Sequence, residues 1–455
     1  MNSETPSGDN TTTSSFLARF FSLHSLPRPL QQISFFYLVI WCLYSIAYSS
    51  TDTFLLLFFL DQWTYQEVSL IFSIQIITQI LFDYPTGVLG DWLGQKLVLI
   101  LAFSLKILSL VFLVINPSFL YFILYGILSG LGNSQLSGAL DSWFDNKYRD
   151  LSCGIDANRE IYTMFQARLY IVYILIAALT CFLSGLIAQN ISRRFLFFIE
   201  MFFYFVIMLL VIWKIEHKKN PESKNLSIQA YFDQFRNGLA FIFKRRDMFF
   251  IFIGIAFFET FLNQVWTKLI FIPFYKSYAI TDANLGLLRW ISLIIDIILI
   301  SFLQRFPSKS KKPKLGFVVA EIGIICGLMV ILGYIVIVPA SPTFQISKFI
   351  GLILIGISLG IPYRLVYLYY SKVMFDLVPN EIRNSVYSLL PTLILLFSIP
   401  GTLIGGAVIT SHYLVGGIIF VIFGVGCGII LQIIGFNYIR KETRPPNMIS
   451  DQIPE

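Results

Sequence analysis

The sequence contains few charged residues, few histidines and few cysteines for its length. Asp, Glu, Lys and Arg make up only 13% of the 455 residues, whereas 56% are hydrophobic, and the mean hydropathy is +0.74. Soluble domains carry about 25% charged residues, so this composition excludes an ordinary soluble fold. A lipid bilayer can surround so much apolar side chain, because helices satisfy their own backbone hydrogen bonds. We therefore expect an all-α membrane protein.

The rare residue types exclude several kinds of chemistry. The three histidines, His24, His217 and His412, lie in predicted loops or near the termini and share no pattern typical of a metal site or of histidine-based catalysis. The five cysteines show no metal-ligand or disulfide spacing. No phosphate loop of the form G-x-x-x-x-G-K-[ST] occurs, which argues against direct use of ATP. We expect no enzymatic activity, no metal and no cofactor.

The basic residues indicate topology rather than nucleic-acid binding. The formal net charge is +7, but Lys and Arg are dispersed over short loops and form no continuous basic surface. They concentrate in the segment 214–247 and in the loop 305–314, whereas the alternate loops hold little beyond Arg193, Arg194 and Lys276. Lys and Arg are enriched in cytoplasmic loops. This distribution predicts a multi-pass protein of the cell membrane with both termini in the cytoplasm.

Twelve apolar runs approach the roughly 20 residues that a helix needs to cross a bilayer. They are 33–60, 68–89, 97–115, 118–144, 159–188 and 195–213, followed by 248–275, 284–306, 315–338, 344–373, 382–410 and 413–438. The predicted organisation is a cytoplasmic segment 1–32, a six-helix bundle 33–213, a linker 214–247, a second six-helix bundle 248–439 and a tail 440–455. Within the linker, residues 227–243 alternate in the manner of an amphipathic helix on the inner membrane surface.

A glycine-rich motif lies between the second and third predicted spans. The stretch 83–96 reads DYPTGVLGDWLGQK, and it resembles the loop 2–3 motif G-x-x-x-D-R-x-G-R-K of the major facilitator superfamily. The positions that match are Gly87, Asp91, Gly94 and Lys96. Trp92 and Gln95 stand where the family usually has arginines. The lead-in before Gly87 and the stretches 138–145 and 376–388 are similar to the prokaryotic drug/proton antiporter-like branch of that superfamily.

This resemblance implies a fold of two six-helix bundles that expose a central site alternately to each side of the membrane. It implies proton-coupled efflux of drugs or other amphipathic solutes by a monomer, with the loop 2–3 motif in a gating role. The alternatives are an uptake permease for a sugar, peptide or organic acid, and a membrane sensor that keeps the fold without transporting. Small solutes, protons and the lipid bilayer are the expected partners, with no nucleic acid.

Several predicted spans carry polar residues inside the bilayer, where a charge is costly and therefore marks a cavity, a partner or a function. The candidates for lining a cavity or for coupling are Asp52, Gln79, Asp83, Asp141, Arg168, Glu259, Asn263, Asp296 and Arg364. Some of them, Asp83, Asp141, Arg168 and Arg364 together with Glu321 and Lys372, fall toward the cytoplasmic side and could form structural ion pairs instead. Glu259 and Asp296 lie nearer the midplane. Arg289 lies seven residues before Asp296 and is a possible partner for it.

Overall fold

The computed structural model of the chain describes most of its helical part. It describes residues 16–115, 118–136, 138–152, 154–216, 236, 242–279, 281–310, 312–339, 344–378 and 383–442, and for 84–93, 308–309, 375–376, 383–388 and 440–442 it describes the backbone only. The regular elements in these segments are helices, as the sequence predicts. The predicted amphipathic helix 227–243 falls almost wholly outside the described residues, and the predicted domain boundaries remain predictions.

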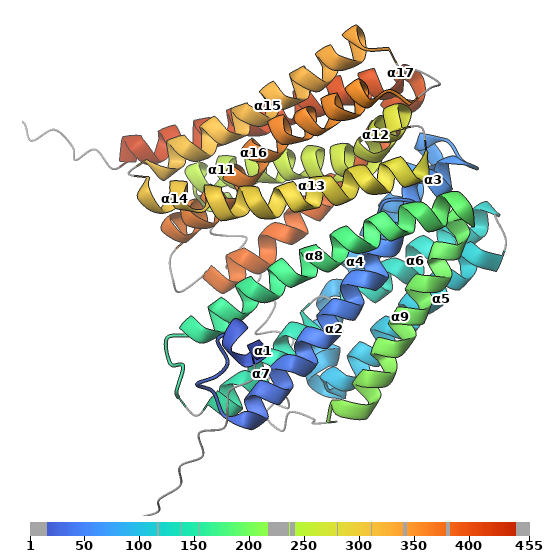
Figure 1. The fold of residues 1–455 in the computed structure, drawn as a ribbon. Helices are drawn as coiled ribbons and strands as arrows, with labels where there is room; N and C mark the ends of the chain where they lie inside the picture. Colours follow the sequence, from blue (N-terminus) through green and yellow to red (C-terminus); the bar gives the residue numbers. More distant parts are fainter. Residues whose placement is uncertain are drawn as a thin grey trace, which may run out of the picture.

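The helices form two groups that follow one another along the chain (Figure 1). The first group is α1 (Phe16–Phe20), α2 (Arg28–Asp52), α3 (Leu55–Leu60), α4 (Tyr65–Leu93), α5 (Gln95–Ile115), α6 (Phe119–Leu136), α7 (Ala139–Ser152), α8 (Glu160–Asn190) and α9 (Arg193–Lys214). The second is α11 (Arg246–Glu259), η2 (Thr260–Ile270), α12 (Phe271–Ala279), α13 (Asp282–Leu303), α14 (Arg305–Lys309), α15 (Pro313–Ile337), α16 (Ile346–Leu377) and α17 (Arg383–Glu442). We call these groups the N-half and the C-half.

Ten of the described helical segments are long and apolar enough to cross a membrane. The last of them, Leu389–Ile439, has 51 residues, and non-helical backbone at His412 and Tyr413 divides it into two crossings. The 18-residue helix α6 packs between α4 and α5. With this helix and the two parts of the last segment, the described helices account for the twelve predicted crossings.

The predicted fourth span, 118–144, is wrong as a single helix. It breaks after Leu136, and α7 begins at Ala139. Gly138 between them has a φ of +76°, a conformation that glycine adopts without the steric cost other residues meet. The sequence just before α7, 133–138, reads NSQLSG, and these polar and small residues are the local signal of the break.

The turn that follows α7 is fixed by Asp156. Its carboxylate accepts hydrogen bonds from the backbone N–H groups of Ile161 and Tyr162, at 3.1 and 2.9 Å, and from the Tyr148 hydroxyl at 2.7 Å. Burial alone would raise the pKa of Asp156, but these hydrogen bonds to the ionised form hold it below its usual value. The carboxylate thereby satisfies free N–H groups in the first turn of α8 and ties α7 to it.

The two halves meet mainly through two helix pairs, α8 with α13 and α4 with α17. In Figure 1, α8 runs alongside α13. At this crossing Gly185 faces Gly286, and a Cβ on Gly185 would stand 2.7 Å from the Asp282 carbonyl oxygen and 2.9 Å from the Gly286 Cα. In the second pair, a Cβ on Gly406 would stand 2.3 Å from the Ser69 hydroxyl. Small residues therefore allow the backbones of the two halves to approach closely.

We expect Gly185→Ala to destabilise the contact between the halves. The added methyl group overlaps backbone atoms of α13, which cannot rotate away, so we expect a loss of about 1–3 kcal/mol. Thermal unfolding of the purified protein in detergent measures this loss as a lower melting temperature. Gly333→Ala is the matched control, because a Cβ there meets nothing within 4 Å. Equal melting temperatures for the two variants would contradict the proposed close approach.

Candidate functional site

A cavity of about 370 Å³ lies between the two halves. We call it the central cavity. Its wall contains five ionisable groups of acidic or basic residues: Asp52, Lys106 and Glu200 from the N-half and Lys268 and Arg289 from the C-half. The rest of the wall includes amides and aromatic rings, namely Gln75, Asn133, Asn263, Gln264, Tyr48, Phe72, Tyr125 and Phe271, and it also includes hydroxyl groups and the aliphatic side chains of Leu55, Leu56, Leu110 and Ile272. The cavity therefore mixes polar with apolar surface and carries three cationic groups against two carboxylates.

One ion pair crosses the central cavity from half to half. Arg289 Nη2 on α13 lies 3.5 Å from Asp52 Oδ2 at the end of α2, and its guanidinium also lies 5.2 Å from the centre of the Phe271 ring. The possible pair between Arg289 and Asp296 does not form. Seven residues separate the two by about 10 Å along one helix, whereas Arg364 on α16 reaches Asp296 from the neighbouring helix at 2.6 Å.

Sequence reasoning missed Lys106, Glu200 and Lys268. Lys106 on α5 is 8% exposed, and its Nζ lies 3.3 Å from the Ser129 hydroxyl. Glu200 on α9 is 7% exposed and accepts a hydrogen bond of 2.6 Å from the Thr51 hydroxyl. Lys106 and Glu200 are each the single charge of an apolar run, and that isolation is the signal that could have identified them. Lys268 shares its run with Glu259.

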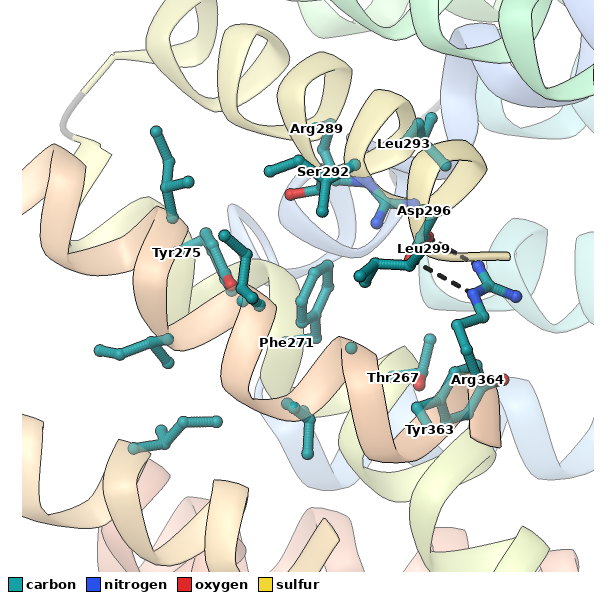
Figure 2. Close-up of a pocket in the computed structure, with 18 of the residues that line it drawn as sticks. Thr267, Phe271, Tyr275, Arg289, Ser292, Leu293, Asp296, Leu299, Tyr363 and Arg364 are labelled. Carbon is teal, nitrogen blue, oxygen red and sulfur yellow. Dashed lines mark hydrogen bonds and ion pairs between the residues drawn. The ribbon is translucent and has the colours of Figure 1, made fainter. Parts of the chain in front are cut away.

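A second cavity, of about 240 Å³, lies within the C-half and shares Thr267, Phe271 and Arg289 with the central cavity. We call it the side pocket. Figure 2 shows the Asp296–Arg364 pair at one end of it and Tyr275 and Phe271 along its length. Most of the other side chains in its wall are aliphatic or aromatic. The predicted residues Asp296 and Arg364 thus lie in a cavity, but they are paired with each other.

A third cavity, of about 330 Å³, lies in the N-half. It contains the predicted residues Gln79 and Asp141, together with Trp41 and Tyr44. The carboxylate of Asp141 accepts a hydrogen bond of 2.6 Å from the Tyr37 hydroxyl. Asn133 lines both this cavity and the central cavity, so the two adjoin.

Glu259 stands at the start of a π-helical segment. The turns from Thr260 to Ile270 close hydrogen bonds five residues apart, a rare geometry that often occurs at functional sites. Asn263 donates a hydrogen bond to the Glu259 carboxylate, and the Tyr363 hydroxyl lies 3.3 Å from the Asn263 amide oxygen. The chain of contacts reaches the central cavity at Asn263. Thr267 donates instead to the Leu262 carbonyl, at 3.0 Å, because the wider turns change its register.

The remaining predicted residues lie away from these cavities. Arg168 on α8 donates to backbone carbonyls of α1, at Arg19 and Phe20. Asp83 on α4 is half-buried and lines none of the three cavities.

The loop 2–3 motif is described in part. Gly94 has a φ of +82°, a conformation that glycine adopts without steric cost. Lys96 Nζ donates to the Ile212 carbonyl of α9 at 2.7 Å. The side chain of Asp91 and the surroundings of Gly87 lie outside the described residues, so the gating role of the motif remains a prediction.

An ion-pair cluster joins the halves at the end that the sequence predicts to face outward. Arg193, at the start of α9, contacts Asp61 at 2.6 Å within the N-half and Asp282 of the C-half at 2.8 Å. Lys276 contacts the same Asp282 carboxylate at 2.6 Å. The Gly185–Gly286 crossing lies beside this cluster, because the Gly185 position abuts the Asp282 carbonyl. The two halves are therefore closed together at this end.

Comparisons with known proteins agree with this architecture. The sequence model of the Major Facilitator Superfamily matches residues 35–401. A relative from Bacillus subtilis (strain 168), the uncharacterized MFS-type transporter YxaM, is 23% identical over 281 residues, which are 60% of this chain and 63% of that protein. The match thus spans less than two thirds of that relative.

The fold also resembles solved structures. Two crystal structures of the nucleoside transporter NupG, one of them of a point mutant, superpose with a TM-score of 0.67. Their sequences are 15% identical to this chain, and the superposition covers 90% of this chain and 99% of theirs. At that identity the likeness concerns the fold.

A double-mutant cycle on Asp52 and Arg289 tests the ion pair across the central cavity. Asp52→Asn, Arg289→Gln and the double variant should show a coupling energy near the lower end of about 0.5–3 kcal/mol, because the groups are 3.5 Å apart in a water-accessible cavity. Thermal unfolding measures it. The same cycle on Asp296 and Arg364, 2.6 Å apart, is the reference and should give a larger value. A coupling energy for Asp52–Arg289 larger than that for Asp296–Arg364 would contradict the weak ion pair that we describe across the central cavity.

Proposed function

The chain belongs to the major facilitator superfamily, and on that premise we propose that it is a proton-coupled secondary transporter of small polar solutes that carry an anionic group. Membership in this superfamily makes the protein a multi-pass membrane transporter and not an enzyme. The class of solute, the proton coupling, its location in the cell membrane with cytoplasmic termini and its monomeric state are our proposals. So is its membership in the drug/proton antiporter-like branch.

The observation that carries this proposal is the excess of cationic groups in the central cavity. Arg289 is paired with Asp52, and Glu200 is the other carboxylate in the wall, on the same side as Lys106. Lys268 is exposed to the cavity and forms no ion pair with any described residue. The carboxylate that acts on it from farther away is Asp52, which Arg289 already pairs. A solute that brings a carboxylate or phosphate would supply the missing countercharge, which favours anions over cations.

The rest of the wall suits a small organic molecule. A cavity of about 370 Å³ is within the range of ligand pockets, roughly 300–1,000 Å³. The amides of Gln75 and Asn133 can hydrogen-bond polar groups of a solute, and the rings of Tyr125 and Phe271 can pack against its apolar part. Both halves contribute to the wall, which is the arrangement that alternating access requires.

We assign the binding of the transported proton to Glu259. The other predicted midplane acid, Asp296, is held by Arg364, and Asp52 is held by Arg289, so each of these charges has a compensating partner. Glu259 has no cationic partner among the described residues, and its carboxylate is instead hydrogen-bonded by Asn263, which lines the central cavity. A carboxyl group in this position can change its protonation when a solute contacts Asn263. Glu200 is the second candidate, because it lines the cavity directly.

A second candidate function is efflux of amphipathic solutes. The observation that favours it is the side pocket, where Trp266, Phe271 and Tyr275 provide an apolar wall. An amphipathic cation that bound there would take the Asp296 carboxylate from Arg364 and extend into the central cavity through the shared residues. The nucleoside transporter NupG has the same fold, which makes nucleosides a further class of polar solute to test.

Thermal-shift screening distinguishes these solute classes. We expect small carboxylates or phosphate esters to raise the melting temperature more than nucleosides or amphipathic cations, since a ligand of the folded state stabilises it by about 2.7 kcal/mol at 100 times its Kd. Lys268→Gln should remove this shift. Lys348→Gln is the matched control, because Lys348 contacts the Pro339 carbonyl away from the cavities. Stabilisation by cations alone would favour the second function.

Flux into proteoliposomes tests the coupling. Using the anion with the largest thermal shift, we expect a pH gradient to drive uptake by the unmodified protein. Glu259→Gln should lower the rate of gradient-driven uptake by about tenfold or more. The variant should retain exchange of labelled solute at equal pH, because the solute site remains intact. Glu200→Gln is the comparison. If Glu259→Gln keeps both fluxes, the proton is carried elsewhere, and binding without any flux would indicate a sensor.

A further inference from the structure

Glu321 and Gln432 form a buried polar pair that the transport scheme does not use. Glu321 on α15 and Gln432 on α17 are both 0% exposed, and neither lines any of the three cavities. The Gln432 side-chain amide Nε2 donates a hydrogen bond of 2.8 Å to Glu321 Oε1. Gln432 is also tightly held, because Gly254 of α11 packs against it at a position where a Cβ would stand 2.7 Å from its Cγ.

Two oxygen atoms of this pair have no hydrogen-bond donor in the described structure. They are Glu321 Oε2 and Gln432 Oε1, and both belong to the planar groups that the 2.8 Å bond already joins. Burying an acceptor without a donor is costly, and burying an ionised carboxylate without one is more so. A single proton on Glu321 Oε2 resolves both problems, because that hydroxyl can donate to Gln432 Oε1 while Oε1 of the acid continues to accept from the amide.

The charges around Glu321 offer no alternative compensation. In the described helices, no Lys or Arg lies within ion-pair distance of Glu321, and the charged group that acts on it is another acid, Glu259 of α11. From α16, the residues that face α15 on either side of Glu321 are Tyr369, next to Gly316, and Pro362 and Leu359, next to Gly323 and Gly327. The aromatic contact at the α17 side, Phe436, is with Lys314 two turns earlier on α15.

We propose that Glu321 is a proton-binding site in which the acid and the Gln432 amide form a reciprocal pair of hydrogen bonds. The proton resides on Glu321 Oε2 and joins α15 to α17 within the C-half. It is a structural proton, separate from the one that we assign to Glu259, because the pair has no contact with the cavities through which a solute would pass. The inference does not depend on the class of solute.

Infrared spectroscopy of the purified protein tests the proposal, because a protonated carboxyl group absorbs apart from an ionised one and shifts in D₂O. We expect Glu321→Gln to remove one component of the protonated-carboxyl absorption at neutral pH. This variant should fold with a melting temperature close to that of the unmodified protein, since an amide at position 321 can donate to Gln432 and accept from it as the acid does. Asp296→Asn is the matched control. Its carboxylate is paired with Arg364, so its loss should reduce only the ionised-carboxylate absorption.

Loss of ionised-carboxylate absorption alone in Glu321→Gln would overturn the proposal. Transport provides a separate test. Glu321→Gln should retain flux driven by a pH gradient, whatever the outcome for Glu259→Gln. If Glu321→Gln lost the gradient-driven flux but kept exchange at equal pH, Glu321 would carry the transported proton and the structural assignment would be wrong.

Discussion

An ionised group inside a bilayer is stable only next to a countercharge, a hydrogen-bonding partner or water, and this constraint determines where the polar residues of the chain lie. Asp296 is compensated by Arg364, and Asp52 by Arg289. Lys268 instead lies at the wall of a cavity, where water can solvate it when no solute is bound. Glu321 has neither a cation nor a cavity, and it is the acid that we infer to be protonated, with the Gln432 amide as its hydrogen-bonding partner. A charged group that is paired within the protein thus has a structural role, whereas a charged group at a cavity wall is available to a ligand.

The apolar spans were predictable from the sequence because each needs only a run of residues that lipid can surround. In the loop 2–3 motif, Gly94 has a positive φ, and the role of the motif remains a prediction. The pairing of the charged residues was not predictable from the sequence. Arg289 and Asp296 share one helix face, but the partner that each finds comes from a helix remote in sequence. A pattern along one helix contains no information about its neighbours, and the only sign of Lys106 and Glu200 in the sequence is that each stands alone in its span.

The spacing of Glu259, Asn263 and Thr267 shows a different limit. Turns of 3.6 residues would place all three on one face of a helix, whereas the structure has π-helical turns from Thr260 to Ile270. Asn263 still reaches Glu259, but Thr267 turns to the Leu262 carbonyl. Helical periodicity therefore accounts for the contact between Glu259 and Asn263, whereas the partner of Thr267 depends on the local π-helical winding.

The π-helical winding also makes the segment Arg246–Ala279 shorter than an α-helix of the same residues would be. The segment Arg246–Ala279 has 34 residues, more than the roughly 20 that a bilayer requires. A π-helical stretch places more residues in each turn than an α-helix does. If these turns rewound to α-helix, the segment would lengthen and the part beyond Ile270 would rotate about the helix axis. Such rewinding would turn Phe271 and Tyr275 about the helix axis relative to Glu259.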